Sequence, residues 1–237
     1  MIAKPLRDRL YRLGTLKPPG LGAQVQEQGL TLIECLVAIV VVALVSSAIA
    51  PALVLSVATR VHSQKSEQAL ALAQSEIDSI RVLVERGGYT AAVLPPLAAA
   101  LEDKDVATAL GPNLTVTDPT NFAHALPKDI DGDGATDFLV QRFRARGQVV
   151  GGVPVAFAMG VRVYDRDAAA AGNLPITPAR LAMTSGDGGR STRPLAVLYT
   201  TMATSNQGDS LCSLITYFNS SAAAGSTKTL PTACTAN

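Results

Sequence analysis

Residues 27–34 of this chain read Glu27-Gln28-Gly29-Leu30-Thr31-Leu32-Ile33-Glu34, and an apolar run follows them directly. From Cys35 to Thr59 the chain contains no Asp, Glu, Lys or Arg. A helix over these 25 residues would be roughly 37 Å long at about 1.5 Å per residue, which exceeds the roughly 30 Å hydrocarbon core of a bilayer. The sequence therefore predicts a membrane-spanning helix that carries one carboxylate, Glu34, near its start.

The carboxylate of Glu34 is the unusual feature of this segment. A charge in or near hydrocarbon costs on the order of 1–3 kcal/mol, depending on its depth. A buried carboxylate becomes tolerable when an ammonium group neutralises it, and a cut in the chain just before Glu34 would create one. Alternatively, Glu34 is an ordinary acidic residue in the first turn of a helix, where the macrodipole favours it.

The stretch resembles the class III signal of type IV prepilins and type II secretion pseudopilins. The resemblance implies that a prepilin peptidase cuts after Gly29 and that Leu30 becomes the N-methylated amino terminus. It also implies that Glu34 docks each subunit beside the terminal amine of its neighbour in a filament. Pro51 corresponds to a proline that kinks the helix of many pilins. Two features depart from the family: Leu30 replaces the commoner phenylalanine, and the leader is long. Without the resemblance, Gly29 would be a loop residue before a membrane anchor and Pro51 a simple kink.

The charges on either side of the span predict its orientation. Five basic residues precede it, whereas Arg60 and Lys65 are the only ones in the first twenty residues after it. This asymmetry predicts a cytoplasmic leader and an exported bulk, that is, a single-pass inner-membrane protein that then joins a periplasmic or cell-surface filament. A secretory signal peptide would have an apolar region of about 7–15 residues followed by its cleavage site. Because this run is longer, we expect it to stay in the mature protein.

A helical pattern continues beyond the span. Apolar residues recur at helical spacing between Val61 and Glu85, and Gly87-Gly88 then supplies a stop. We therefore predict one helix of roughly 55 residues, with a membrane half and an amphipathic half that packs on a head domain. The apolar positions of the second half are Val61, Ala69, Leu72, Ala73, Ile77, Ile80 and Val84.

Downstream, the apolar pattern changes to a period of two. Strands are predicted at 138–145, 153–164 and 195–202, with a shorter candidate at 113–117. Because no helices are evident between them, we expect an antiparallel sheet against the amphipathic half of the long helix. The predicted fold is α+β and resembles a pilin.

We accordingly expect four regions along the chain. These are a leader at 1–29, a transmembrane and filament-core helix at 30–58, its amphipathic continuation at 59–88 and a β-rich head at 89–237. The net charge of +1 gives no reason to expect a nucleic-acid partner acting through bulk charge.

An acidic loop in the head has the spacing of a calcium site. Carboxylates at loop positions 1, 3, 5 and 9 with a glycine at position 6 match the first part of an EF-hand loop. The predicted calcium ligands are Asp129, Asp131, Asp133, the Ala135 carbonyl and Asp137. Position 12 is Val140 instead of a bidentate glutamate, and a strand follows in place of a helix. The alternative is a solvated acidic turn that introduces the strand at Phe138.

Two cysteines, Cys212 and Cys234, lie in the last 26 residues of the sequence, outside the membrane in the predicted topology. An oxidising compartment favours a disulfide between them, which would be worth about 3 kcal/mol by loop entropy. The resemblance supports the pairing, since many type IV pilins close their C-terminal region with such a bridge. Two free thiols are the alternative. Cys35 lies in the span and is expected to be a small buried hydrophobe.

The sequence does not predict an enzyme. Neither histidine, His62 or His124, has cysteine or histidine neighbours at metal-ligand spacing. Asp165 and Asp167 could form a carboxylate pair, although an exposed strand end explains them equally well. We expect no catalytic residues.

The predicted function is that of a structural subunit of a type IV pilus or type II secretion pseudopilus. A minor subunit is favoured because the head is large and the leader unusual. The expected partners are the prepilin peptidase, other pilin or pseudopilin subunits and a membrane assembly platform. The alternative is an unprocessed single-pass membrane protein with an exported domain that binds calcium or another ligand.

Overall fold

The structure is a computed structural model that describes residues 31–98, 106–113, 118–179, 191–205, 209–222 and 225–234. The leader, Gly29, Leu30 and most of the short candidate strand at 113–117 lie outside these residues. The chain divides into two compact units, Met1–Ala52 and Leu53–Asn237. In the first unit the described residues form the beginning of a helix, and the second unit is the head together with the rest of that helix.

A single helix, α1, extends over Leu32–Arg86, and its 55 residues confirm the predicted length. The first half is mostly Val, Leu, Ile and Ala and has no charged residue from Cys35 to Thr59, whereas the second half carries charged residues. The helix ends immediately before Gly87-Gly88, where the glycines were expected to stop it. Local sequence signals therefore account for the whole of α1.

The head contains one five-stranded antiparallel sheet, which confirms the α+β prediction. The central strand β4 pairs with β2 along one edge, from Phe138↔Asp165 to Arg144↔Met159. The short β3 continues along the same edge, where Gln148 pairs with Ala156. Strand β5 pairs along the other edge of β4, from Ala156↔Ala203 to Val163↔Ala196. The strands are β1 (Leu126–Lys128), β2 (Phe138–Arg144), β3 (Gln148–Val150), β4 (Val153–Asp165) and β5 (Ala196–Ala203).

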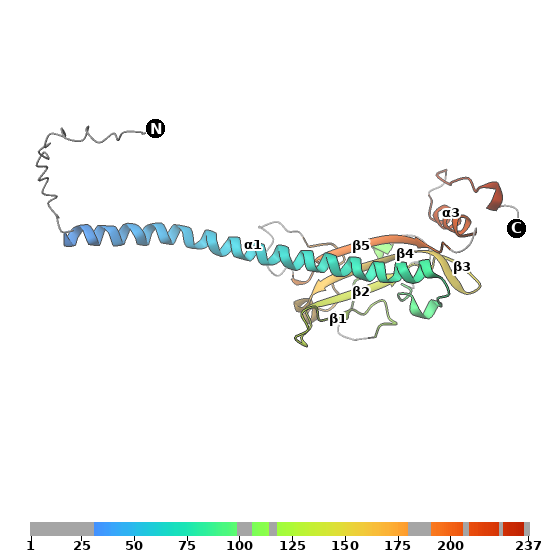
Figure 1. Cartoon of the computed structure of the whole chain (residues 1–237), viewed down its shortest axis with the longest axis horizontal. Helices are drawn as coiled ribbons and strands as arrows, with labels where there is room; N and C mark the ends of the chain where they lie inside the picture. Colours follow the sequence, from blue (N-terminus) through green and yellow to red (C-terminus); the bar gives the residue numbers. More distant parts are fainter. Residues whose placement is uncertain are drawn as a thin grey trace, which may run out of the picture. The chain divides into compact units, whose positions relative to one another are not determined.

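The second half of α1 packs on one face of this sheet (Figure 1). Ala69 and Ala73 are fully buried there, and Ile77, Ile80 and Val84 continue the same stripe at helical spacing. Alternate side chains of β2 and β4 complete this core, namely Phe138, Val140, Phe157, Met159, Val161 and Val163. Because successive strand residues point to opposite faces, the intervening residues must be covered by other parts of the head.

Short elements cover the opposite face of the sheet. Phe143 and Ala156 pack there with Tyr217 of a helix, α3 (Asp209–Ser221). Tyr164 and Leu174 form a further cluster beside the 3-10 helix η3 (Arg166–Ala170). The sequence predicts no helix at α3, which is therefore a feature that only the structure shows. Three other single-turn 3-10 helices complete the described elements: η1 (Ala91–Val93), η2 (Val106–Thr108) and η4 (Thr232–Cys234).

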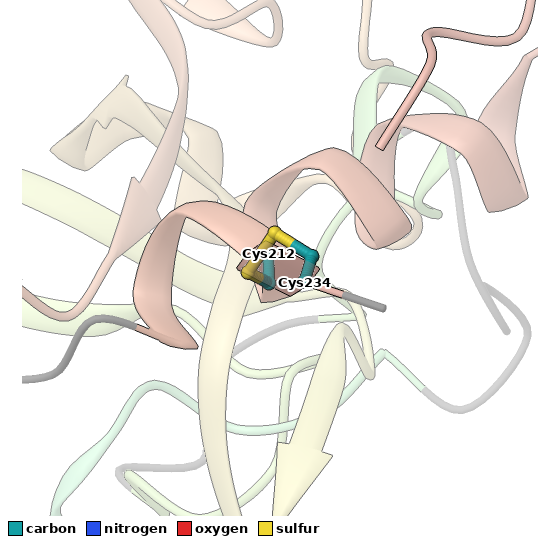
Figure 2. Close-up of a disulfide and its surroundings, with 2 residues drawn as sticks. All are labelled: Cys212 and Cys234. Carbon is teal, nitrogen blue, oxygen red and sulfur yellow. A yellow bond between two sulfur atoms is a disulfide. The ribbon is translucent and has the colours of Figure 1, made fainter. Parts of the chain in front are cut away.

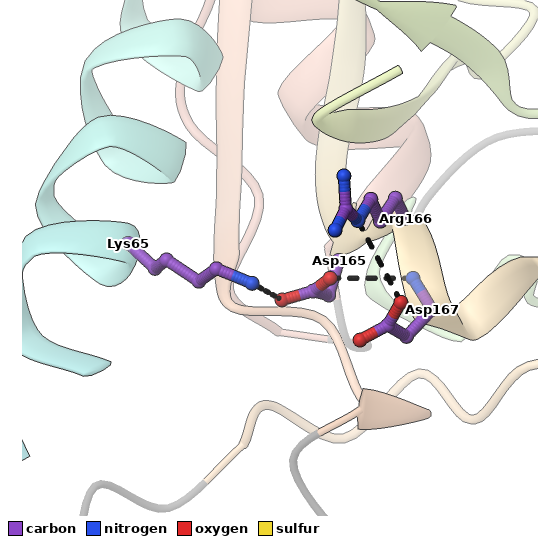
Figure 3. Close-up of polar contacts among 4 residues, drawn as sticks. All are labelled: Lys65, Asp165, Arg166 and Asp167. Atoms are coloured by element: carbon purple, nitrogen blue, oxygen red, sulfur yellow. Dashed lines mark hydrogen bonds and ion pairs between the residues drawn. The ribbon is translucent and has the colours of Figure 1, made fainter. Parts of the chain in front are cut away.

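Ion pairs hold α1 on the sheet in addition to the apolar core. The carboxylate of Glu76 is largely buried and accepts from Lys128 Nζ at 2.8 Å and Arg142 Nη1 at 3.0 Å. Closer to the membrane half of α1, Lys65 Nζ lies 2.7 Å from Asp165 Oδ2 (Figure 3). Since a buried carboxylate is stable only when paired, these contacts select one register of α1 on the sheet.

Candidate functional site

The first turn of α1 is capped by Thr31. Its Oγ1 accepts a hydrogen bond from the Glu34 backbone N–H at 3.3 Å, and its carbonyl accepts from the N–H groups of Glu34 and Cys35 at 3.0 and 3.1 Å. Thr31 thus occupies the N-cap position and Glu34 the third helical position, the spacing of a capping box. The Thr-x-x-Glu spacing of residues 31–34 is the sequence signal for this cap.

The membrane half of α1 is an exposed apolar surface. Every residue from Thr31 to Val61 is exposed in the single chain, including Leu32 at 84%, Ile39 at 70% and Val54 at 71%. Soluble monomers rarely expose apolar patches larger than a few hundred Å². The helix is long and apolar enough to cross a membrane, although its position near the N-terminus is one that a signal sequence shares. Lipid or other chains must cover this surface.

The polar groups within the apolar half are accommodated by the helix itself. Ser47 Oγ donates to the Leu44 carbonyl and Thr59 Oγ1 to the Leu55 carbonyl, both at 2.8 Å. Pro51 lies inside α1 without ending it, although a proline provides no N–H for the carbonyl one turn earlier. The boundary between the two compact units falls after Ala52, directly beside this proline.

The acidic loop between β1 and β2 folds around its own carboxylates. Asp129 accepts from the N–H of Gly132 at 2.7 Å through one oxygen and from the N–H of Gly134 at 2.8 Å through the other. These backbone hydrogen bonds lower the pKa of Asp129. At the other end of the loop, Asp137 Oδ2 accepts from the Ile130 N–H at 2.8 Å. This hydrogen bond closes the loop from its second position to its ninth.

Three of the predicted calcium ligands come together in this loop. Carboxylate oxygens of Asp129, Asp131 and Asp137 lie within 4.8 Å of one another. Asp133 is outside that group, and its Oδ1 accepts from the Ala135 N–H at 2.7 Å. The three clustered oxygens suit a hard cation, but a self-bonded acidic turn would also hold them there. Calcium at this loop stays a prediction.

The two C-terminal cysteines form the predicted disulfide (Figure 2). It joins Cys212 in the first turns of α3 to Cys234 in η4, with 5.4 Å between the Cα atoms. Between them, the side chain of Asn219 bonds both the N–H and the carbonyl of Lys228, at 2.7 and 2.8 Å. The bridge and these hydrogen bonds anchor residues 225–234 to α3.

Asp165 and Asp167 do not form a carboxylate pair of the catalytic kind. Asp165 is mostly buried, so the expectation of an exposed strand end is also wrong for it. One of its oxygens pairs with Lys65 and the other caps η3 by accepting from the Asp167 N–H at 3.2 Å (Figure 3). The Asp167 side chain is exposed and lies 3.7 Å from Arg166 Nε. Both residues are accounted for by structure.

Comparison with protein families places a motif over the start of α1. Residues 25–50 match the model described as the prokaryotic N-terminal methylation motif. The chain carries the class III signal of type IV pilins. No curated protein and no solved structure matches the chain significantly. The methylation motif includes Gly29, Leu30 and Glu34, and beyond residue 50 the comparisons add nothing to what the fold shows.

The methylation motif supports a prepilin-processed protein of the pilin or pseudopilin type. Such a signal implies processing by prepilin peptidase and assembly with other pilins, and it indicates a structural subunit. Together with the apolar half of α1, it fits a membrane anchor that becomes part of a surface-exposed filament. The structure of α1 and the family motif thus point to the same segment.

Proposed function

We propose that this protein is a minor structural subunit of a type IV pilus or a type II secretion pseudopilus. In this proposal the peptidase cuts after Gly29, Leu30 is methylated, and the apolar half of α1 leaves the membrane to enter the filament core. The single observation that carries the proposal is the methylation motif at residues 25–50 on a helix whose residues 35–59 are exposed and free of charged side chains. The large head, tied to the other half of α1 by Glu76, supports a minor subunit over a major one.

In the proposed filament, Glu34 is the residue that sets the position of each subunit. Its carboxylate lies in the first turn of α1, four residues beyond Leu30, whose amine would be freed by the cut. Surrounded by apolar side chains of neighbouring helices, a lone carboxylate would be costly, whereas one paired with an ammonium group is stable. The capping by Thr31 keeps this carboxylate at a defined place on the helix.

Glu34→Leu is expected to leave cleavage intact and to reduce the protein recovered in sheared filaments at least about tenfold, since a lost buried ion pair is worth several kcal/mol. The measurement is an immunoblot of membrane and filament fractions from the host that makes the protein. Glu67→Leu is the matched control, because Glu67 is an exposed glutamate on the same helix. Equal filament yields for the two variants would remove the proposed role of Glu34.

We also propose that the acidic loop binds calcium through Asp129, Asp131 and Asp137, with Asp133 and the Ala135 carbonyl as further ligands. The clustering of three carboxylates supports this proposal. Because position 12 of the loop is Val140 in β2, no bidentate glutamate is available there, and affinity in the range of about 10⁻⁴–10⁻³ M of extracellular modules is expected. Calcium would stabilise the loop that starts β2.

If calcium binds with a dissociation constant of about 1 mM, 10 mM calcium should raise the stability of the head by about 1.4 kcal/mol. The measurement is the urea midpoint of the full chain in detergent, with and without calcium. Asp129→Asn combined with Asp131→Asn should abolish the increase, whereas Asp167→Asn should preserve it. An unchanged midpoint in the wild type would mean that the loop is a solvated acidic turn.

The alternative function remains an unprocessed single-pass membrane protein with an exported ligand-binding domain. The calcium experiment cannot separate it from a filament subunit, since both allow a metal in the head. The amino terminus of the mature protein does separate them, because only the filament subunit requires the loss of residues 1–29.

A further inference from the structure

A hollow of about 340 Å³ lies on the side of the sheet that faces α1. Its walls are Ile80 of α1, the segment 91–97 and the turn at Pro119 and Thr120. The remaining lining residues are Arg142 and Arg144, which point to the same face of β2 as Phe138 and Val140. The hollow is therefore built from four separate parts of the chain: α1, the segment 91–97, the turn at 119–120 and β2.

The frame of this hollow is fixed by backbone hydrogen bonds. The strand β1 pairs only with residues 138–140 of β2, so the rest of that edge is available to another segment. Residues 96–98 take this place: the Arg144 N–H donates to the Pro96 carbonyl at 3.0 Å, and the Ala98 N–H to the Arg144 carbonyl at 2.9 Å. Arg144 is thus held rigidly at the base of the wall.

The head has another buried arginine, Arg162, whose guanidinium donors have several hydrogen-bond acceptors. Its guanidinium donates to the carbonyls of Ala107 and Ala109 at 3.0 and 2.8 Å and to Tyr199 Oη at 3.1 Å. It also lies 4.7 Å from the centre of the Phe143 ring. The donors of Arg162 are used to hold the segment around η2 on the sheet, so a structural role explains it completely.

Arg144 is different, because it is buried without comparable partners. Its side chain belongs to a residue only 8% exposed, and the described part of the chain offers it one hydrogen bond, from Nη1 to the Ala145 carbonyl at 3.2 Å. Its Nε is buried, and no acceptor for it lies among the described residues. Burial lowers the pKa of Arg144, which indicates that its surroundings disfavour the cation. A guanidinium has five donors, so most of its capacity is unused.

Arg142 adds a second positive charge to the same wall. Its Nη1 pairs with Glu76 at 3.0 Å, while its Nε is buried and has no acceptor in the described part of the head. Among the residues that the structure describes, the carboxylate of Glu76 pairs with both Arg142 and Lys128, whereas no ion pair joins Arg144 to a carboxylate. The arginine side of the hollow therefore lacks one negative charge.

The other walls are apolar. Ile80, the alanines and valine of η1, Leu94 and the prolines at 95, 96 and 119 line them. A volume of about 340 Å³ is at the lower end of the range for small-ligand pockets. The occupant that matches both the walls and the charge is small, partly apolar and anionic.

We propose that this hollow binds a carboxylate carried on a short apolar stem, with Arg144 as its principal charged partner. The carboxylate can come from a free organic acid or from an acidic residue of a partner polypeptide, since both present the same group. Planar bidentate donation from a guanidinium to a carboxylate is the strongest contact that Arg144 can make here. The proposal is independent of filament assembly.

The test uses the full chain in detergent micelles and ligand-observed NMR titration with four probes. The first two are isovalerate and its uncharged isostere isovaleramide. The others are the blocked peptide acetyl-Ala-Leu-Glu-Leu-Ala-amide and its Gln counterpart. We expect each carboxylate probe to bind at least tenfold more tightly than its neutral partner. Tighter binding of the peptide than of isovalerate would identify a partner polypeptide as the source, and the reverse would identify a free acid.

Arg144→Gln should weaken carboxylate binding at least tenfold, whereas the control Arg166→Gln, at the opposite end of the sheet, should not. Because a core substitution can disturb folding, Ala92→Phe supplies a second variant: Ala92 is exposed and lines the hollow, so the ring fills it while Arg144 is kept. Loss of binding in both variants, with unchanged urea midpoints, supports the site. Equal binding of isovalerate and isovaleramide, or undiminished binding by both variants, overturns it.

Discussion

Gly29→Val is expected to abolish cleavage after residue 29, so that the variant keeps residues 1–29 and has no methylated Leu30. In the proposed processing step, the residue before the cut must be small, and a β-branched side chain restricts the backbone and adds bulk at that point. We expect no cleaved product at all. Because the uncut chain has no free amine beside Glu34, the variant should also not assemble into filaments. Intact mass and N-terminal peptide mapping of the membrane-extracted protein measure it directly.

The control for this prediction is Gly20→Val, which changes another glycine of the leader by the same side chain. Its product should begin at N-methyl-Leu30, as in the wild type. Wild-type protein that retains the leader would contradict the processing step and leave the single-pass membrane protein as the function. Cleavage of Gly29→Val at the normal position would show that Gly29 is not the residue before the cut.

Gly147→Ala is expected to destabilise the head by about 4 kcal/mol. Gly147 lies between β2 and β3 with φ +71°, a conformation that costs a residue with a side chain about 1–2 kcal/mol. An added Cβ would press on the Ala156 carbonyl and on Phe157, whose Cα would be 2.8 Å away. Because these atoms belong to the central strand β4, they cannot move aside, and overpacking adds about 1–3 kcal/mol.

Urea unfolding of the full chain followed by tyrosine fluorescence measures this loss. The chain has no tryptophan, and four of its five tyrosines lie in the head unit. Gly151→Ala is the control: Gly151 has φ +57° but nothing within 4 Å of an added Cβ, so only the backbone cost of about 1–2 kcal/mol is expected. Equal midpoints for the two variants would show that the contact with β4 is not tight.

The features that the sequence predicted well are those with local causes. The charge-free run from Cys35 to Thr59, the helical spacing up to Val84 and the stop at Gly87-Gly88 predicted α1 to within a few residues. Strand alternation likewise predicted β2, β4 and β5. The acidic loop was visible because its residues are neighbours in the chain, and the structure clusters three of its four carboxylates.

The features that the sequence missed depend on contacts between distant residues. Helix α3 is short, and its place on the sheet is set by Tyr217 packing beside Phe143. In the sequence, Asp165 was explained as part of an exposed strand end. In the structure it is buried and pairs with Lys65 of α1. Arg144 and Arg162 both lie within strands and cannot be told apart in the sequence. In the described part of the structure, Arg162 is surrounded by acceptors, whereas Arg144 is not.

The sequence by itself determined that this protein has a prepilin-type signal, a long helix with an apolar first half and an antiparallel head. Each of these features depends on neighbouring residues or on the short repeat of apolar residues along the chain. Only the tertiary structure decided which charges are paired, which face of β2 meets α1, and that two arginines line a hollow with one carboxylate too few. The physical reason is that burial and electrostatic pairing depend on which distant segments meet, and packing alone brings them together.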